Sequence, residues 1–159
     1  MTARKRAKAP RLLLIQGANM AYLGKRQPEL YGTTSAAELD RMLEAHAERE
    51  GYGLEIAYFH VEGEAIARIY AAIEKGLDAL VINPAGFLYA GYALRDCLRA
   101  IPVPTIEVHM TNIEKRGSHS VTAEAAVGYV AGFGLDSYLA GIEMALRLVG
   151  AKKRLADGG

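Results

Sequence analysis

The sequence predicts a single α/β domain, a flavodoxin-like three-layer sandwich with a five-stranded parallel sheet in the strand order 2-1-3-4-5. Two observations predict it: short apolar runs alternate with amphipathic helical segments along the chain, and glycine, proline or capping residues separate them. Each parallel connection needs a right-handed crossover, so helices are expected on both faces of the sheet. The 159 residues suit one catalytic domain over residues 11–150. A basic, flexible N-terminus is expected at residues 1–10 and a flexible tail at residues 151–159.

The expected strands are short and apolar. Residues 12–15 form a continuous apolar run, which is typical of a strand that is buried on both faces. The later strands are expected at residues 54–59, 79–82, 105–108 and 127–133. Together these runs supply the whole sheet.

Capping residues mark two of the expected helices. Ser35 and Glu38 have the spacing of a capping box at the start of the first helix. A second helix is expected at residues 64–75, a third at residues 92–100, and Asp136 can cap the last one. The second helix is expected to turn four side chains toward the sheet: Ile66, Ile69, Tyr70 and Ile73.

The composition excludes several classes of protein. Hydrophobic residues make up 51% and charged residues 23%, and no run approaches the roughly 18 apolar residues that a membrane span needs. The 19 basic and 18 acidic residues give a formal charge of +1, which provides no field that favours nucleic acid. The basic start lacks the apolar core of a signal peptide, and the single cysteine, Cys97, is expected to be a buried structural thiol in a reducing compartment. We therefore expect a cytoplasmic protein that binds a small molecule, with no nucleic-acid or membrane partner.

Motifs for nucleotides and metals are weak. Gly17 is followed by no glycine-rich phosphate loop, and the chain has no paired-cysteine motif. The histidines are scattered along the chain: His46, His60, His109 and His119. His46 is expected on a helix face, whereas His60 follows the second strand and can point into the site. We expect catalysis with neither a metal nor another cofactor.

Three strand ends bring polar side chains to one edge of the predicted sheet. The first strand runs into Asn19, the third into Asn83, and the fourth through Glu107 into His109. In open parallel sheets, ligands bind outside the carboxyl ends of the strands, where the strand order reverses. A lone histidine is as often structural as catalytic, but the position of His109 at a strand exit beside two asparagines favours catalysis.

The loop after the first strand, residues 23–32, contains a candidate base. Arg26 and Tyr31 both lie in it, and glycines at its two ends suit a segment that moves. A neighbouring cation favours phenolate over phenol and so makes a tyrosine a better base. Tyr31 is therefore a candidate general base, although most loop tyrosines simply pack.

Four motifs taken together resemble those of one enzyme family. They are the segment from Gly17 to Gly32, Asn83-Pro84, Leu94-Arg95-Asp96 and Glu107-Val108-His109. In residue type, order and spacing they resemble the type II 3-dehydroquinate dehydratase (type II dehydroquinase) family, and the likeness runs from Arg11 to Val149. The resemblance implies a cofactor-free elimination of water from 3-dehydroquinate, through an enolate, to 3-dehydroshikimate in the shikimate or quinate pathway.

The resemblance also implies catalytic roles. Tyr31, activated by Arg26, would remove a proton from the carbon beside the ketone. Asn19 would hold a water that stabilises the developing enolate. His109 would protonate the departing hydroxyl, and Glu107 would orient the imidazole.

Further positions match substrate-binding residues of the family. Asn83 matches a contact to a substrate hydroxyl, and Met110 and Thr111 stand where the family binds the substrate carboxylate. Arg116 stands in for one family arginine. Asp96 matches a residue that reaches the site of a neighbouring subunit, because the family assembles trimers into dodecamers. A trimer-based homo-oligomer, up to a dodecamer, is thus expected.

Several positions depart from the family pattern. Tyr89 replaces a family histidine, and the segment at residues 112–120 is shorter than in the family and lacks a second arginine that contacts the ring hydroxyls. Gln16 and Ala18 replace an asparagine and a proline. These changes leave two alternatives open besides the dehydratase: a paralogous lyase on a related cyclic hydroxy-ketone, and a non-catalytic binding protein on the same fold.

Overall fold

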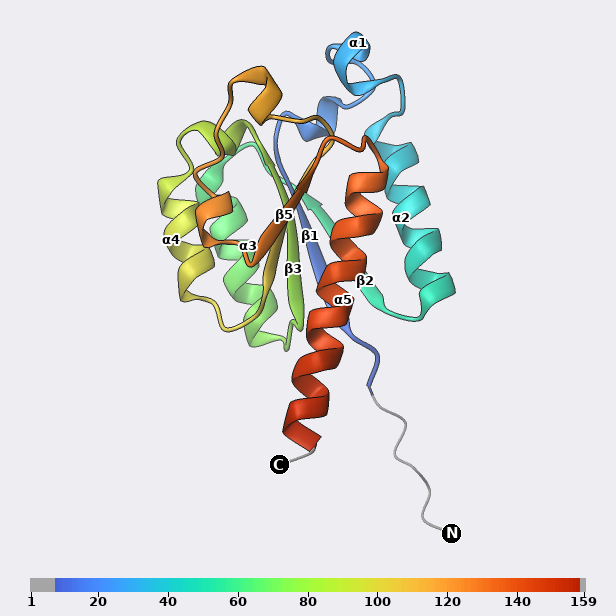
Figure 1. The fold of residues 1–159 in the computed structure, drawn as a ribbon, viewed down its shortest axis with the longest axis vertical. Helices are drawn as coiled ribbons and strands as arrows, with labels where there is room; N and C mark the ends of the chain where they lie inside the picture. The colour runs from blue at the N-terminus through green and yellow to red at the C-terminus, as the bar shows by residue number, and fades with distance from the viewer. Residues whose placement is uncertain (1–7, 158–159) are drawn as a thin grey trace.

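The computed structural model describes residues 8–157, which form a five-stranded parallel sheet in the order β2-β1-β3-β4-β5 (Figure 1). The predicted strand order is confirmed. The strands are β1 (Arg11–Ala18), β2 (Gly53–Tyr58), β3 (Ala79–Ala85), β4 (Thr105–His109) and β5 (Gly128–Ala131). Most of the expected basic N-terminus, residues 1–7, lies outside the described part of the chain.

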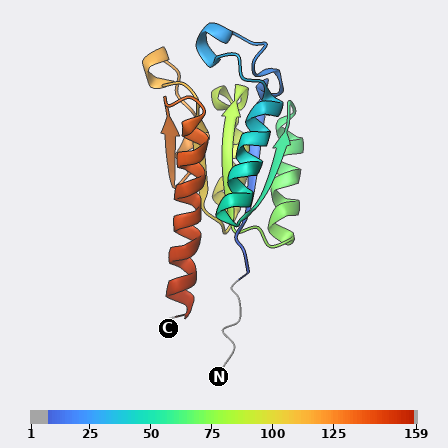
Figure 2. The ribbon, with the colours of Figure 1, turned by 90° about the vertical axis from the view of Figure 1, so that its right-hand side faces the viewer.

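Helices cover both faces of the sheet. On one face lie α2 (Ala36–Glu50) and α5 (Asp136–Asp157), and on the other lie α3 (Glu62–Glu74) and α4 (Tyr92–Ala100) (Figure 1). A single turn, α1 (Pro28–Tyr31), lies beyond the carboxyl ends of the strands, at the end of the molecule opposite the C-terminal end of α5 (Figure 2). The segments that connect these elements contain four short 3-10 helices among the described residues: Met20–Tyr22, Gly86–Tyr89, Glu114–Arg116 and Ala123–Ala125.

The capping box that the sequence predicts for α2 is present. The hydroxyl of Ser35 accepts a hydrogen bond from the backbone N–H of Glu38 at 3.2 Å, and the carboxylate of Glu38 accepts one from the backbone N–H of Ser35 at 2.7 Å. The two bonds satisfy N–H groups that the helix itself cannot pair. Gly51 ends α2 in the left-handed conformation, which costs a glycine little.

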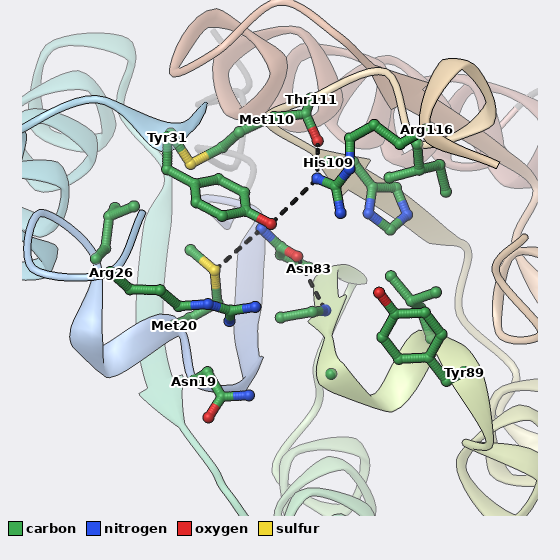
Figure 3. Close-up of a pocket in the computed structure, with 15 residues that line it drawn as sticks. Asn19, Met20, Arg26, Tyr31, Asn83, Tyr89, His109, Met110, Thr111 and Arg116 are labelled. Carbon is green, nitrogen blue, oxygen red and sulfur yellow. Dashed lines mark hydrogen bonds between the residues drawn. The ribbon is translucent and has the colours of Figure 1, made fainter. Parts of the chain in front are cut away.

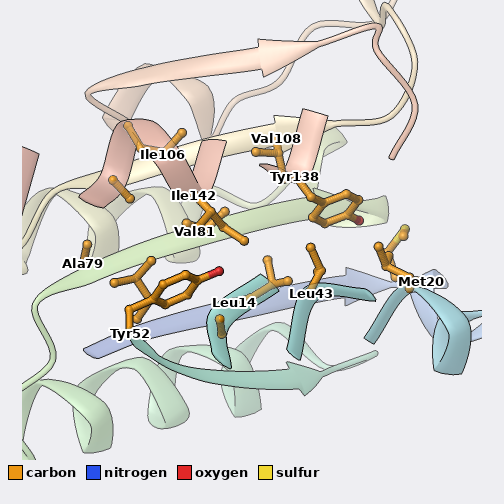
Figure 4. Close-up of a cluster of buried hydrophobic side chains, with 14 of the residues drawn as sticks. Leu14, Met20, Leu43, Tyr52, Ala79, Val81, Ile106, Val108, Tyr138 and Ile142 are labelled. Atoms are coloured by element: carbon orange, nitrogen blue, oxygen red, sulfur yellow. The ribbon is translucent and has the colours of Figure 1, made fainter. Parts of the chain in front are cut away.

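Two hydrophobic cores, one on each face of the sheet, join it to the helices. The larger one fills the space between the sheet and α2 and α5, and it contains Leu14, Leu43 and Ile142 (Figure 4). The second lies under α3 and α4 and contains Leu13 and Cys97, so the cysteine is a buried thiol as expected. Successive residues of β1 enter opposite cores, which explains the continuous apolar run.

Three details of the predicted elements are wrong. Helix α5 continues to Asp157, so residues 151–157 are helical rather than a tail, because Ala151, Lys152 and the residues after them favour helix. Strand β5 is shorter than expected at both ends. Tyr70 does not face the sheet: it is 44% exposed, because the buried face of α3 is set by Ala65, Ile69 and Ala72.

Among residues 8–157, no helix is both long enough and apolar enough to cross a membrane.

Candidate active site

A pocket opens at the carboxyl ends of β1, β3 and β4, at the edge of the sheet where the sequence places the site (Figure 3). Nine of the eleven predicted site residues line it: Asn19, Arg26, Tyr31, Asn83, Tyr89, His109, Met110, Thr111 and Arg116. The other two, Glu107 and Asp96, do not.

The ends of β1 and β3 approach each other closely at Gly17. A Cβ atom added there would lie 1.9 Å from the carbonyl oxygen of Pro84, so only glycine fits. This close approach brings Asn19, which follows β1, and Asn83, which lies near the end of β3, into one pocket.

Backbone strain is concentrated around the pocket. In residues 8–157, three residues other than glycine have a positive φ: Asn19 at 78°, Gln27 at 41° and Ala85 at 46°. Asn19 and Ala85 line the pocket, and Gln27 lies between the pocket residues Arg26 and Tyr31. Such conformations cost energy and are typical of functional sites.

His60 supports Asn19 from outside the pocket. The backbone N–H of Asn19 donates a hydrogen bond to Nδ1 of His60 at 3.2 Å. His60 therefore does not point into the pocket, and instead it holds the strained backbone of a residue that does. His46 lies on α2, as expected, and hydrogen-bonds the hydroxyl of Tyr52 at 2.9 Å.

His109 is held by a buried chain of hydrogen bonds. Its Nε2 donates to Oε1 of Glu107 at 2.6 Å, and the other carboxylate oxygen accepts from the hydroxyl of Thr122 at 2.7 Å. The hydroxyls of Thr122 and Ser120 lie 3.0 Å apart. With Nε2 bound to Glu107, Nδ1 is the nitrogen of His109 that remains for a ligand. A carboxylate in this position fixes the orientation of the ring.

Sequence reasoning missed Thr122. The residue lies beyond the loop that follows β4, and a threonine there carries no sequence signal for a contact to a strand fifteen residues earlier.

Tyr31 lies between two guanidinium groups. Arg116 Nη1 donates to the phenol oxygen at 3.1 Å and to Oγ1 of Thr111 at 2.8 Å (Figure 3). The guanidinium carbon of Arg26 lies 5.5 Å from the centre of the tyrosine ring, over its face. Both predicted arginines thus contact Tyr31, but Arg116 rather than Arg26 binds the phenol oxygen.

Asn83 forms the floor of the pocket and is only 4% exposed. Its Nδ2 donates to the hydroxyl of Tyr138 at 2.7 Å and points toward the sulfur of Met20 at 3.6 Å. Its Oδ1 accepts from the backbone N–H of Ala85 at 3.1 Å. The amide is therefore anchored at both ends.

The rim of the pocket is formed by Tyr89, which is 60% exposed and stands on the turn after β3 (Figure 3). Asp96 is exposed on α4 and lies outside the lining of this pocket. Within one chain, Asp96 is therefore not part of the pocket.

The charges of the pocket favour an anionic ligand. Its lining contains two arginines and one histidine but no aspartate or glutamate. Guanidinium groups bind carboxylates strongly and often with two hydrogen bonds. Among residues 8–157, no group of three His, Cys, Asp or Glu side chains is placed to hold a metal ion.

Known proteins resemble the chain over most of its length. A family model described as dehydroquinase class II matches residues 10–146. The 3-dehydroquinate dehydratase of Herminiimonas arsenicoxydans is 39% identical over 142 residues, which cover 87% of this chain and 98% of the relative. The enzyme of the same name from Ectopseudomonas mendocina is 41% identical over 138 residues, or 85% of this chain and 93% of the relative. The crystal structure of type II dehydroquinase from Butyrivibrio crossotus superposes with a TM-score of 0.83 at 30% identity and covers 86% of this chain and 97% of that chain.

Proposed function

The chain belongs to the dehydroquinase class II family, and from that membership we propose that it is a type II 3-dehydroquinate dehydratase, which converts 3-dehydroquinate to 3-dehydroshikimate by eliminating water. One observation carries the proposal beyond family membership. A tyrosine bound by an arginine and a histidine bound by a buried glutamate face one pocket, so the pocket contains a candidate base and a candidate acid.

Tyr31 is the proposed base. As phenolate it removes a proton from the carbon beside the ketone, and the guanidinium groups of Arg116 and Arg26 stabilise its negative charge. Arg116 does so through a direct hydrogen bond, whereas Arg26 acts through its charge near the ring.

Asn19 is proposed to stabilise the enolate that results. Its side chain would hold a water that donates a hydrogen bond to the enolate oxygen. The strained backbone of Asn19 and its hydrogen bond to His60 fix where that amide stands.

His109 is the proposed acid. It protonates the departing hydroxyl, so that the leaving group is water, and Glu107 stabilises the imidazolium that must form first. Thr122 holds Glu107 from the other side and keeps the carboxylate in place.

Substrate contacts are proposed for the remaining lining residues. Thr111 and the backbone at Met110 bind the carboxylate, with Arg116 beside them. Asn83 binds a ring hydroxyl and Tyr89 closes the rim. The proposed steps use groups of the protein and one water, and they require no cofactor. The named relatives favour this reaction over a paralogous lyase or a non-catalytic binding protein.

Assembly and location follow from the same family. We propose a trimer-based homo-oligomer, up to a dodecamer, in which Asp96 reaches the pocket of a neighbouring subunit. The exposure of Asp96 on α4, away from its own pocket, supports this arrangement. We also propose a cytoplasmic location, which the single buried cysteine supports.

The proposal is tested by incubating the purified protein with 3-dehydroquinate and following ultraviolet absorbance, because the conjugated product absorbs and the substrate does not. Turnover is expected without any added nucleotide and in the presence of a chelator. A protein that is folded and assembled but produces no 3-dehydroshikimate would contradict the proposed function.

A further inference from the structure

A row of polar side chains crosses the sheet beneath the pocket. Tyr58, Gln16 and Asn83 are register partners on β2, β1 and β3, so their side chains lie side by side on one face. Tyr138 reaches them from α5 within the larger core (Figure 4). Gln16 and Tyr138 are 0% exposed, and of the four residues only Asn83 lines the pocket.

The hydrogen bonds along this row have a fixed direction. The hydroxyl of Tyr138 donates its one hydrogen to Oε1 of Gln16 at 2.8 Å, so toward Asn83 it can only accept. Asn83 must therefore present its nitrogen, which lies 2.7 Å from the hydroxyl. Burial raises the pKa of Tyr138, so its hydroxyl keeps the proton on which this direction depends.

The hydrogen bond from Tyr138 fixes the orientation of Gln16, whose other neighbour in the row is Tyr58. The hydroxyl of Tyr58 donates to the carboxylate of Asp40 at 2.7 Å, which leaves its oxygen as an acceptor. Burial raises the pKa of Tyr58, so its hydroxyl keeps the proton that it donates, and the register places Tyr58 beside Gln16. Nε2 of Gln16 has no hydrogen-bond partner within residues 8–157, whereas its Oε1 accepts from Tyr138, so turning the amide around would break that bond and set the NH₂ group against the hydrogen of the Tyr138 hydroxyl. Gln16 thus keeps its oxygen toward Tyr138.

The orientation of Asn83 decides what the pocket offers to a ligand. Its second N–H meets only the sulfur of Met20, which is a weak acceptor, and its Oδ1 keeps one lone pair besides the bond from Ala85. This arrangement can donate to and accept from one hydroxyl group. The reversed amide would place its oxygen against the Tyr138 oxygen, whose one hydrogen is already donated to Gln16, and its NH₂ against the N–H of Ala85.

We infer that Tyr138 and Gln16 are positioning residues that lock the amide of Asn83 in the orientation that recognises a substrate hydroxyl. Neither touches the substrate, and both act through Asn83. The inference rests on the proposed function, because that function assigns Asn83 to bind a ring hydroxyl of the substrate.

Removing the Tyr138 hydroxyl or the Gln16 amide should weaken substrate binding and leave the rate of the chemical step nearly unchanged. Tyr138→Phe deletes the acceptor for Asn83, and Gln16→Met frees the Tyr138 hydroxyl to donate to Asn83 and reverse it. Each variant should raise KM for 3-dehydroquinate about tenfold, the equivalent of about 1.4 kcal/mol, while kcat changes by less than about threefold. Gln16→Met gives an independent reading if Tyr138→Phe fails to fold.

A matched control is available in the same core. Tyr52 is also buried, and its hydroxyl bonds His46 at 2.9 Å, but neither residue lines the pocket. Tyr52→Phe should lower stability and leave KM unchanged. An equal rise of KM in Tyr52→Phe would show that any lost core hydrogen bond has this effect and would overturn the inference.

A double-mutant cycle with Asn83→Ala tests whether the effect passes through Asn83. Once its amide is removed, Tyr138→Phe should raise KM no further, because coupled residues are not additive. If Tyr138→Phe raises KM as much in Asn83→Ala as in the wild type, or if Gln16→Met leaves KM unchanged, the inference is wrong.

The same cycle measured by denaturant unfolding separates this inference from the proposed function. The Tyr138→Phe/Asn83→Ala variant should lose less stability than the two single variants together, whether or not the protein turns over 3-dehydroquinate. If the stability losses of the two single variants simply add in the double variant, Tyr138 does not hold Asn83 in place, even if the enzyme is active. A wild type without turnover would refute the proposed function, and the unfolding cycle alone would then decide whether the lock exists.

Discussion

Arg116 and Arg26 contact Tyr31 in two different ways, which gives them separable roles. Arg116 binds the phenol oxygen directly at 3.1 Å, while Arg26 lies over the ring face at 5.5 Å. The family resemblance assigns activation to Arg26, because the sequence places it five residues before the tyrosine. The contact from Arg116 depends on how the loop after β4 folds back over α1, which sequence spacing does not reveal.

Arg116→Ala should therefore reduce kcat for 3-dehydroquinate by about a hundredfold, as expected when a direct donor to a reacting oxygen is removed. The kcat of Arg116→Lys should fall between those of Arg116→Ala and the wild type, because an ammonium keeps the charge but not the planar geometry in which Nη1 bonds both Tyr31 and Thr111. Arg99→Ala, an exposed arginine outside the pocket, is the control. A larger kcat loss in Arg26→Ala than in Arg116→Ala would reverse this assignment.

Tyr89 tests how the altered rim recognises the substrate. Tyr89→His restores the family's residue and should lower KM for 3-dehydroquinate, so that kcat/KM rises about tenfold. Tyr92→His, an exposed tyrosine outside the pocket lining, should change neither constant. If the wild type already has a low KM and Tyr89→His raises it, the prediction is wrong, and Tyr89 recognises the substrate as well as the family's histidine does.

At the scale of elements, the pocket depends on how closely β1 and β3 approach. Gly17→Ala would place a methyl group 1.9 Å from the carbonyl oxygen of Pro84, so one strand end must move. The free energy of unfolding should fall by about 1–3 kcal/mol, as for other overpacked sites, and kcat should fall with it because Asn19 and Asn83 separate. Gly128→Ala on β5 meets nothing within 4 Å and is the matched control. Equal stability and activity in both variants would contradict a role for the close approach.

The elements were predictable where local chemistry determines them. The capping box at Ser35 and the apolar runs of β1 and β3 need only neighbouring residues, and these predictions are confirmed. Tyr70 was placed wrongly because the face of a helix depends on how closely it packs, and small residues such as Ala65 and Ala72 set that distance. Strand exits alone predicted three residues of the pocket lining, Asn19, Asn83 and His109, whereas the other predicted lining residues came from the loop at residues 23–32 and from the family resemblance. Its supporting contacts were not, since the bond from Tyr138 to Gln16 spans 122 residues.

At the scale of the whole molecule, the proposed assembly makes one site from two chains. Light scattering should give a trimer or a multiple of it. Asp96→Ala and Tyr31→Phe should each be nearly inactive alone, but chains of the two variants assembled together should regain activity, because a pocket with Tyr31 can then meet Asp96 from a neighbour. A stable monomer with full activity would contradict both the assembly and the shared site.

The most direct test of the central claim is the rate at which Tyr31→Phe converts 3-dehydroquinate, measured beside Tyr22→Phe. Tyr22 lies in the same loop region but is 60% exposed and outside the pocket lining, so it controls for loss of a nearby phenol. The wild type and Tyr22→Phe should form 3-dehydroshikimate at similar rates, and Tyr31→Phe should be slower by at least about a thousandfold while remaining folded and assembled. A Tyr31→Phe variant that works at close to the wild-type rate would contradict the assignment of Tyr31 as the base and, with it, the proposed mechanism.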